Sequence, residues 1–383
     1  MAYGVIVALD LVLGACLGVL AAAYVVWPLA VAIAARLAPP RPSEEGTPNV
    51  SLIVVARDER AAIADKLAAC LALDYPAERL EILVASDGST DGTVEEARCF
   101  TEVTVLDLPH FGKTAAAQAA ATRARADILV FTDATTRLRP DALRRLAPAL
   151  LAPDVGCATG RIVYTYDDAP LAVGFRSYQH VVVSQRQAEA RAGTASVVSG
   201  ALHAARRELL LLPVDPWQSY DLVLPLLAAE RGLRAVYVAD AVAVEASRRS
   251  LRSELRARVR IGVRCWLFLG LLAHRWRNVT SRSYLVQVLF HKVARWLGTI
   301  ALLLLAILGP VGLTLGARLA SAATGLVAVG VCLALIGLGA GALARRLPLL
   351  GLPLFFAVVN VAYWIALAQV VRGRRITGWQ PER

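Results

Sequence analysis

A long apolar segment opens the chain and limits its fold more than any other feature. Residues 4–36 carry one acidic residue, Asp10, and exceed the roughly 20 residues with which an α-helix crosses a bilayer. The basic start and shorter apolar core of a cleaved signal peptide are not found there. Since Arg36 and Arg41 follow the segment, the positive-inside bias predicts an outer amino terminus and a cytoplasmic location for the residues that follow.

Three more apolar segments lie near the carboxyl end, at about 296–315, 320–343 and 350–371. The first two are long enough to be predicted as membrane spans. The third starts among prolines and glycines, and basic residues that should be cytoplasmic flank it on both sides. Both flanks can be cytoplasmic only if this segment is re-entrant or interfacial, so the sequence leaves open whether it crosses the membrane.

The positive charge is concentrated in one window. Residues 248–282 hold ten arginines against one acidic residue, Glu254, and so contribute +9 of the net charge of +11. A general nucleic-acid-binding protein spreads its positive charge along a groove, so we expect no nucleic-acid partner. The mixture of arginines and apolar residues predicts an amphipathic helix at the membrane interface, with a solvated helix of the soluble domain as the alternative.

The middle of the chain has a different character. Charged residues make up 19% of the whole sequence and hydrophobic residues 57%, which excludes a disordered chain. The six cysteines are scattered without a C-x-x-C pair, which argues against a disulfide-stapled scaffold or a cysteine zinc site. Short β-branched runs alternate with helical stretches and predict an α/β domain with a mostly parallel sheet. The expected strands are 51–55, 81–85, 103–106, 128–132, 161–165 and 235–238.

These features predict six consecutive regions. They are an N-terminal transmembrane helix (1–37), a linker (38–48), an α/β domain (49–247), a basic amphipathic region (248–295), a C-terminal transmembrane region (296–371) and a basic cytoplasmic tail (372–383).

Acidic residues follow two of the expected strands. In open α/β sheets, ligands bind beyond the carboxyl ends of strands, where Asp87 and Asp133 are expected. A carboxylate such as Asp87 can accept a hydrogen bond from a nucleobase or a ribose, and Asp133 suits Mg²⁺ or Mn²⁺ beside a diphosphate. The alternative for Asp87, Ser89 and Asp91 is an Asx turn that caps a helix.

Two further residues are candidates for phosphate binding and for proton transfer. Lys113 lies in HFGKT before an alanine-rich helix, but the upstream glycine of a phosphate-binding loop is missing, so a surface lysine is an equal alternative. Asp221 begins an apolar helix. It is either a helix-capping acid or a general base that takes a proton from an acceptor hydroxyl.

The order of these segments resembles the membrane-bound family 2 glycosyltransferases, whose catalytic domain has the GT-A fold. VSLIVVARDER resembles the family's first strand and A-R-N-E turn, ASDGSTDGT its D-G-S-x-D-G-T element, and GKTAAAQAA its G-K-x-x-A-L-N helix. FTDATT occupies the D-x-D position, VSGALHAARREL resembles the acceptor-side loop and helix, and YDLVLPLLAAERG resembles the segment of the catalytic base. RARVRIG, FHKVARW and ITGWQPER resemble a bacterial exopolysaccharide-type branch.

The resemblance assigns a role to each matching position. It implies inverting transfer from a nucleotide sugar, with a UDP-sugar as the expected donor, to a lipid-linked or polysaccharide acceptor at the cytoplasmic face of the bacterial inner membrane. Asp221 would be the general base, and Asp133 would bind the nucleotide and hold Mg²⁺ or Mn²⁺. The remaining roles are nucleotide binding by Ala56, Arg57, Glu59, Asp87 and Lys113, and acceptor contact by Gly200 and His203.

The sequence departs from the family pattern in three places. Thr135 replaces the second aspartate of D-x-D, and Tyr220 stands where a second acid would precede Asp221. The Q-x-x-R-W motif of processive synthases is not found at its usual distance after the base. Lys292-x-x-Arg295-Trp296 looks similar but lies far along the chain, so processivity is not inferred from it.

These departures keep one rival hypothesis open, a catalytically degenerate domain that acts as a scaffold for another synthase. A nucleotidyltransferase would need a fuller triphosphate loop than HFGKT. A transporter would need more polar groups inside its spans than Asp10 and Asn360.

Overall fold

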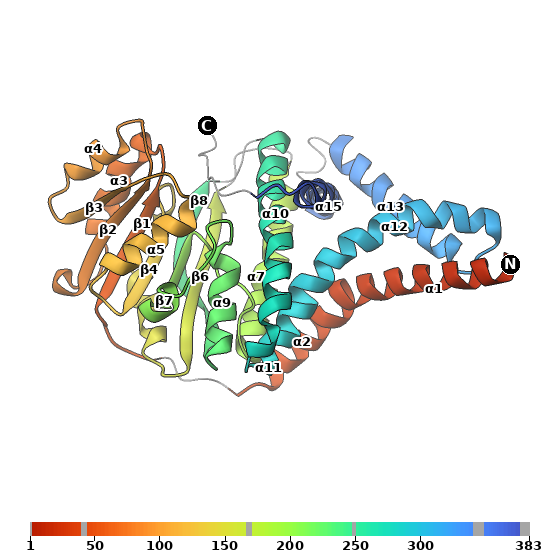
Figure 1. Cartoon of the computed structure of the whole chain (residues 1–383), viewed down its shortest axis with the longest axis horizontal. Coiled ribbons are helices and arrows are strands. Elements are labelled where there is room, and N and C mark those ends of the chain that lie inside the picture. The colour runs from red at the N-terminus through yellow and green to blue at the C-terminus, as the bar shows by residue number, and fades with distance from the viewer. Residues whose placement is uncertain (1, 40–43, 166–170, 247–249, 340–347, 376–383) are drawn as a thin grey trace.

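A computed structural model describes residues 2–39, 44–165, 171–246, 250–339 and 348–375 as one mixed sheet beside a group of long helices (Figure 1). The eight-stranded sheet has the order β3-β2-β1-β4-β7-β6-β8-β5. Its strands are β1 Val50–Ala56, β2 Leu80–Asp87, β3 Val103–Leu108, β4 Ile128–Asp133, β5 Arg137–Leu138, β6 Val155–Thr165, β7 Leu202–Arg206 and β8 Arg234–Ala246.

The half of the sheet that carries β1 is parallel and covered on both faces. β1 pairs in parallel with β2 and β4, and β2 pairs in parallel with β3. All seven residues of β1 are buried, and they alternate between two apolar cores, with Ile53 and Val55 in one and Leu52 and Val54 in the other. The carboxyl ends of β1, β2 and β4 therefore meet at one edge of the sheet, which we call the catalytic edge.

Helices cover the two faces of the sheet. Residues of α3 and α6 share the core of Leu52, whereas residues of α5, α9 and α10 share the core of Ile53. The helices of this part are α3 Arg60–Leu71, α4 Thr93–Arg98, α5 Lys113–Arg123, α6 Ala142–Leu146, α7 Leu171–Ala192, α8 Arg207–Leu210, α9 Tyr220–Glu230 and α10 Leu251–Arg275.

Three continuous helical stretches are long and apolar enough to cross a membrane, Tyr3–Leu37, Arg282–Leu315 and Leu352–Val371. They support a membrane-associated protein. The first two each contain a π-helical turn, η1 Ala22–Val26 and η5 Val288–Val293. The helices of this part are α1 Ala2–Ala21, α2 Trp27–Leu37, α11 Arg282–Gln287, α12 Ala294–Leu315, α13 Ala320–Gly339 and α15 Pro348–Val371.

The polar residue inside the first apolar segment has a structural partner. The Asp10 carboxylate accepts hydrogen bonds from the backbone N–H groups of Arg318 (3.2 Å) and Leu319 (2.9 Å) just before α13. These are donors that a helix start leaves without an intrahelical acceptor. Asp10 thus fixes the start of α13 against α1.

The third C-terminal segment is a single helix, α15, despite Pro353 inside it. Figure 1 views α15 nearly along its axis, whereas α1 and α12 run across the picture, so α15 is not parallel to those two helices. The predicted span 320–343 is helical through Gly339, and its last residues lie outside the described part of the chain.

The sheet and the long helices share one core. The apolar cluster that contains Ile53 continues through Phe268 of α10 to Trp296 of α12 and Tyr363 of α15. The helix of the basic window is therefore packed against both the sheet domain and α15, and its location at headgroup depth stays a prediction.

A buried carboxylate links the same parts. Glu189 of α7 is fully buried, and its Oε1 accepts hydrogen bonds from Trp27 Nε1 of α2 (3.0 Å) and from Gln185 Nε2 (3.0 Å). Its Oε2 lies 2.7 Å from His291 Nδ1 in η5 and accepts from Ser196 Oγ (3.2 Å). We call these five residues the Glu189 hub.

The structure confirms the predicted fold class and adds two strands. All six predicted strands are present, but β6 and β8 are much longer than expected. The segment that resembles a loop and helix contains strand β7, because Leu202–Arg206 pair with β4 on one side and β6 on the other. Both faces of β7 are buried, so its sequence shows no alternation of polar and apolar residues. Residues 40–43 of the expected linker (38–48), the boundary at 247–249 and the ending ITGWQPER lie outside the described residues.

Removal of the Glu189 carboxylate should weaken the packing of the sheet domain against the long helices. We expect Glu189→Ala to lower stability by about 3 kcal/mol or more, because four buried donors lose their acceptor. Thermal unfolding in detergent measures this. Gln187→Ala, at an exposed position of the same helix, is the matched control and should leave the melting temperature unchanged. Equal melting temperatures for the two variants would contradict the role of the hub.

Candidate active site

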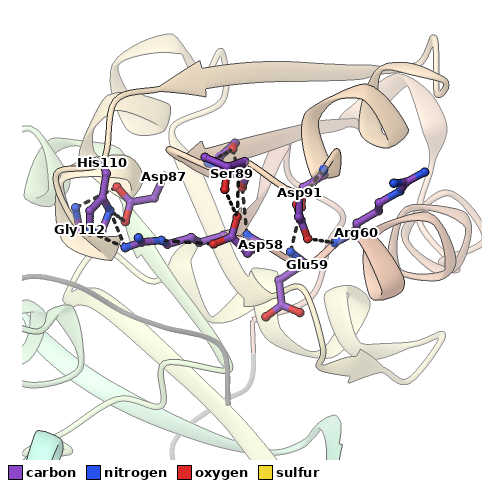
Figure 2. Close-up of polar contacts among 12 residues, drawn as sticks. Asp58, Glu59, Arg60, Asp87, Ser89, Asp91, His110 and Gly112 are labelled. Carbon is purple, nitrogen blue, oxygen red and sulfur yellow. Dashed lines mark hydrogen bonds and ion pairs between the residues drawn. The ribbon is translucent and has the colours of Figure 1, made fainter. Parts of the chain in front are cut away.

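The loops after β1, β2 and β3 interlock at the catalytic edge (Figure 2). Asp87, at the end of β2, is 2% exposed, and its Oδ1 accepts hydrogen bonds from the N–H groups of Phe111 (2.9 Å) and Gly112 (2.8 Å). Its Oδ2 lies 3.0 Å from His110 Nδ1, and Arg57 donates to the same imidazole ring. Asp87 therefore fixes the loop that leads into α5.

A glycine permits the close approach of these loops. Gly88 has a φ of +68°, and a Cβ there would lie 2.8 Å from the Cβ of His110. Only glycine adopts this conformation without strain, and no side chain fits in the space.

The next residues along the same loops hold the backbone. Asp58 Oδ1 accepts a hydrogen bond from Thr90 N (2.8 Å), and Asp91 Oδ2 accepts one from Arg60 N (3.1 Å). Asp91 Oδ1 accepts from Thr93 N (3.0 Å), the first residue of α4. Asp91 thus caps this helix, as the alternative interpretation of the D-G-S-T-D-G-T segment predicted.

A cation and an acid meet at the end of β4. Lys113, the first residue of α5, forms an ion pair and hydrogen bond with Asp133, the last residue of β4. The neighbouring Thr114 Oγ1 donates to the backbone oxygen of Gln218 (2.6 Å), shortly before α9 begins. This hydrogen bond ties the Lys113–Asp133 pair to the helix that carries Asp221.

Asp221 differs from the other two aspartates because its carboxylate is not engaged. It lies in the first turn of α9, and no hydrogen bond or ion pair of this carboxylate is found among the described residues. A Cβ at Gly200 would lie 3.0 Å from Asp221 Oδ1, so the missing side chain leaves room for the carboxylate. Asp221 is thus the aspartate that is free to accept a proton.

His203 of β7 lies behind the site. Its ring stacks on Phe131, with 5.0 Å between ring centroids, and its Nδ1 donates to the backbone oxygen of Ser199 (2.8 Å). Burial lowers the pKa of His203, and the charge of Asp221 acts in the opposite direction. The ring supports the loop that presents Gly200.

A cavity of about 320 Å³ joins the edge of the sheet to the long helices, and we call it the catalytic cavity. Four of the predicted site residues line it, Lys113, Asp133, Gly200 and Asp221. Among the described residues, Ala56, Asp87 and His203 are buried and are not part of its lining. Arg57 and Glu59 lie in the loop after β1.

The structure adds cavity residues that the motifs did not assign. Arg186 of α7, Arg264 of α10, and Lys292 and Trp296 from η5 and α12 line the same cavity as Asp221. Lys292 and Trp296 belong to the K-x-x-R-W sequence that resembled Q-x-x-R-W. That resemblance is the signal that could have identified them, but their distance along the chain hid the contact.

The sequence model of the family described as "Glycosyl transferase family 2" matches residues 51–211. This range begins in β1, includes Asp87, Lys113 and Asp133, and ends after α8. The sheet domain belongs to glycosyltransferase family 2.

Relatives of the domain come from bacteria. An N-acetylglucosaminyltransferase of Mesorhizobium japonicum is 28% identical over 239 residues, which cover 57% of this chain and 56% of the relative. A beta-monoglucosyldiacylglycerol synthase of Synechocystis is 30% identical over 116 residues, covering 28% of this chain and 24% of that protein. The chain spans about half the length, or less, of the curated relatives it matches.

The fold of the whole chain has a solved counterpart. The mannosyltransferase PcManGT of Pyrobaculum calidifontis, solved with GDP-Man and Mn²⁺, has a TM-score of 0.68 and 23% identity. The likeness covers 96% of this chain and 99% of that one. The family 2 domain and the long helices thus recur together in one fold.

Glu59 supplies a pH-dependent contribution to stability. Burial, together with the negative charges of Asp133, Asp91 and Asp58, raises the pKa of Glu59 to about 7. Figure 2 shows the Glu59 carboxylate pointing away from the contacts of the neighbouring loops. Between roughly pH 4.5 and 7 the folded state keeps a proton that the unfolded chain releases, so this group makes the fold less stable as the pH rises.

We expect Glu59→Gln to raise the melting temperature at about pH 8 and to leave it nearly unchanged at about pH 5. Thermal unfolding in the presence of a chelator measures both values. The matched control is Glu95→Gln, at an exposed position of α4. A stabilisation that is the same at both pH values would contradict the raised pKa.

Proposed function

We propose that this domain transfers a sugar, with inversion, from a nucleotide-sugar donor to an acceptor that the membrane presents. The proposal rests above all on one observation, that the Lys113–Asp133 pair and the unengaged Asp221 carboxylate share one cavity. A UDP-sugar is the expected donor. A lipid-linked or polysaccharide acceptor at the cytoplasmic face of the bacterial inner membrane fits the apolar helices and the arginines that follow the first of them.

The proposed reaction is a single displacement. Asp221 takes the proton of the acceptor hydroxyl while that oxygen attacks the anomeric carbon of the donor sugar. The bond from this carbon to the diphosphate oxygen breaks, and the nucleoside diphosphate leaves with the bonding electrons. No covalent sugar–enzyme intermediate forms, so a second carboxylate nucleophile is not needed.

Cationic side chains offset the charge of the leaving diphosphate. Lys113 lies at the start of α5, where the helix dipole adds to its charge. Arg264 lies within the electrostatic influence of both Asp133 and Asp221. We propose that these two cations bind the donor diphosphate from opposite elements, α5 and α10.

The side chains of the site fit a divalent cation only together with the diphosphate of the nucleotide sugar. Among the described residues, no three histidine, cysteine or acidic side chains gather as a metal site, and Thr135 replaces the second acid of D-x-D. Mg²⁺ and similar ions use one or two carboxylates with phosphate oxygens, which Asp133 and a diphosphate can supply. A bound Mg²⁺ or Mn²⁺ would neutralise part of the charge on the diphosphate.

The first test removes the proposed base. We expect Asp221→Asn to lower sugar transfer about 10²- to 10⁴-fold with little change in donor affinity, because an amide cannot take the proton. The assay follows radiolabelled sugar from a panel of UDP- and GDP-sugars into the lipid extract or polymer. Asp240→Asn, at an exposed position of β8, is the control. Wild-type transfer by Asp221→Asn would remove this residue as base, and a wild-type protein that turns over no donor would favour the scaffold.

The second test concerns Asp133. We expect Asp133→Asn to reduce, about tenfold or more, the affinity for a nucleoside diphosphate in the presence of Mn²⁺, because the only acid of the D-x-D position loses its charge. The measurement is the ligand-induced rise of the melting temperature, with and without Mn²⁺. An unchanged rise with Mn²⁺ would contradict a role of Asp133 in metal binding.

A further inference from the structure

A second cavity between the long helices shares part of its wall with the catalytic cavity. This crevice has a volume of about 110 Å³ and lies among α7, the η5–α12 stretch and α15. Six residues line both spaces, namely Tyr178, Val182, Arg186, Lys292, Trp296 and Tyr363. They form the wall that the two cavities share, which we call the junction.

The two cations of the junction have no polar partner among the described residues. No hydrogen bond or ion pair of Arg186 or Lys292 is found in the part of the chain that the structure describes, and Nε of Arg186 is buried without an acceptor. Arg295 lies close enough to add its positive charge, and the acid of this region, Glu189, is held within its own hub. Unpaired cations at the wall of a cavity are costly unless an anion binds there.

The local helix geometry turns one of these cations into the cavity. Lys292 lies in η5, a π-helical turn inside an otherwise α-helical stretch. Such turns are rare and often mark functional sites, because the extra residue changes the direction of the side chains. In a regular α-helix, the side chain at position 292 would point in a different direction.

Part of the crevice wall is aromatic and exposed at the surface. Tyr24 and Phe356 line it and are 37% and 36% exposed, and both lie on stretches long and apolar enough to cross a membrane. A ligand at the junction can therefore extend from a cationic site to a surface that would face acyl chains. This arrangement fits an anionic amphiphile rather than a small soluble anion.

The donor diphosphate is a poorer fit for the junction. Arg264 is influenced by Asp133 and Asp221, whereas the charged groups around Lys292 are Arg186, Arg295 and Glu189. The cations of the cavity thus form two groups, one beside the aspartates and one beside the crevice. Each group suits a separate anion.

We propose that the junction binds the phosphate of a phosphate-bearing lipid through Arg186 and Lys292, with the start of its hydrocarbon chain in the crevice. An arginine and a lysine together suit the several oxygens and the double charge of a phosphate. The inference deepens the proposed function, on which it rests, because it makes the acceptor a lipid with a phosphate close to its reacting oxygen.

The test measures binding without any donor. Native mass spectrometry of the full chain in detergent is carried out with monododecyl phosphate, dodecanol and inorganic phosphate. We expect monododecyl phosphate to bind at least tenfold more tightly than the other two probes. Lys292→Met and Arg186→Gln should each weaken it about tenfold or more, while Lys292→Arg should retain most of the affinity.

Arg191→Gln is the matched control, because Arg191 is exposed and lies on the same helix as Arg186. It should bind the probe like the wild type. Comparison of Lys292→Arg with Lys292→Met separates loss of charge from loss of packing, and the melting temperature of each variant verifies its folding.

Equal binding of dodecanol would show an apolar site and overturn the proposal. Equal binding of inorganic phosphate would show a free-phosphate site and overturn the lipid part, as would wild-type affinity in both charge-removing variants. Because no sugar is transferred in this assay, its failure leaves the proposed function intact. Failure of the Asp221→Asn test would in turn leave the binding site standing.

Discussion

The buried carboxylate of Glu189 is the interaction on which the arrangement of this protein depends. Its two oxygens accept hydrogen bonds from α2, α7 and the loop before Gly200, and one of them contacts His291 of η5. Burial acts to raise the pKa of Glu189, but the contacts with His291 and Trp27 lower it to about 2, so the group stays ionised. An ionised buried group needs all its partners in place, and this requirement fixes two long helices against the sheet domain.

Asp87, Asp133 and Asp221 show how different the surroundings of identical side chains can be. Asp87 accepts hydrogen bonds from backbone N–H groups, and Asp133 is paired with Lys113. The Asp221 carboxylate has no polar partner among the described residues. The anchor of a loop, a member of an ion pair and a carboxylate without a polar partner thus differ only in what surrounds the side chain. Arginines of α10 line the same cavity as Asp133 and Asp221.

Much of the fold could be predicted because it depends on local patterns. β1 is a buried apolar run that ends in polar residues, and the apolar segment 4–36 is long enough to span by itself. The convergence of Asp133 and Asp221 was predicted from strand ends and from the resemblance to the family, and both residues line one cavity. Asp87 was expected beside them, but its carboxylate accepts hydrogen bonds from the backbone of the 110–112 loop.

Other parts of the site depend on contacts between distant segments. Lys292 reaches the cavity of Asp221 only because η5 packs against α7, and no local pattern encodes that packing. Strand β7 has both faces buried and therefore lacks the alternation that identifies a strand. The sequence contains these residues as candidates, but the assignment to one site requires the tertiary structure.

The continuous core between sheet and spans has a consequence for the choice of acceptor. Because Phe268, Trp296 and Tyr363 lie in the same apolar cluster as Ile53, the described part of the sheet domain packs directly against the long helices. Asp221 would then stand at one fixed height above the lipid surface. This fixed height would select acceptors by depth. A molecule whose nucleophilic oxygen lies too far above or below Asp221 in the membrane would not reach the sugar donor.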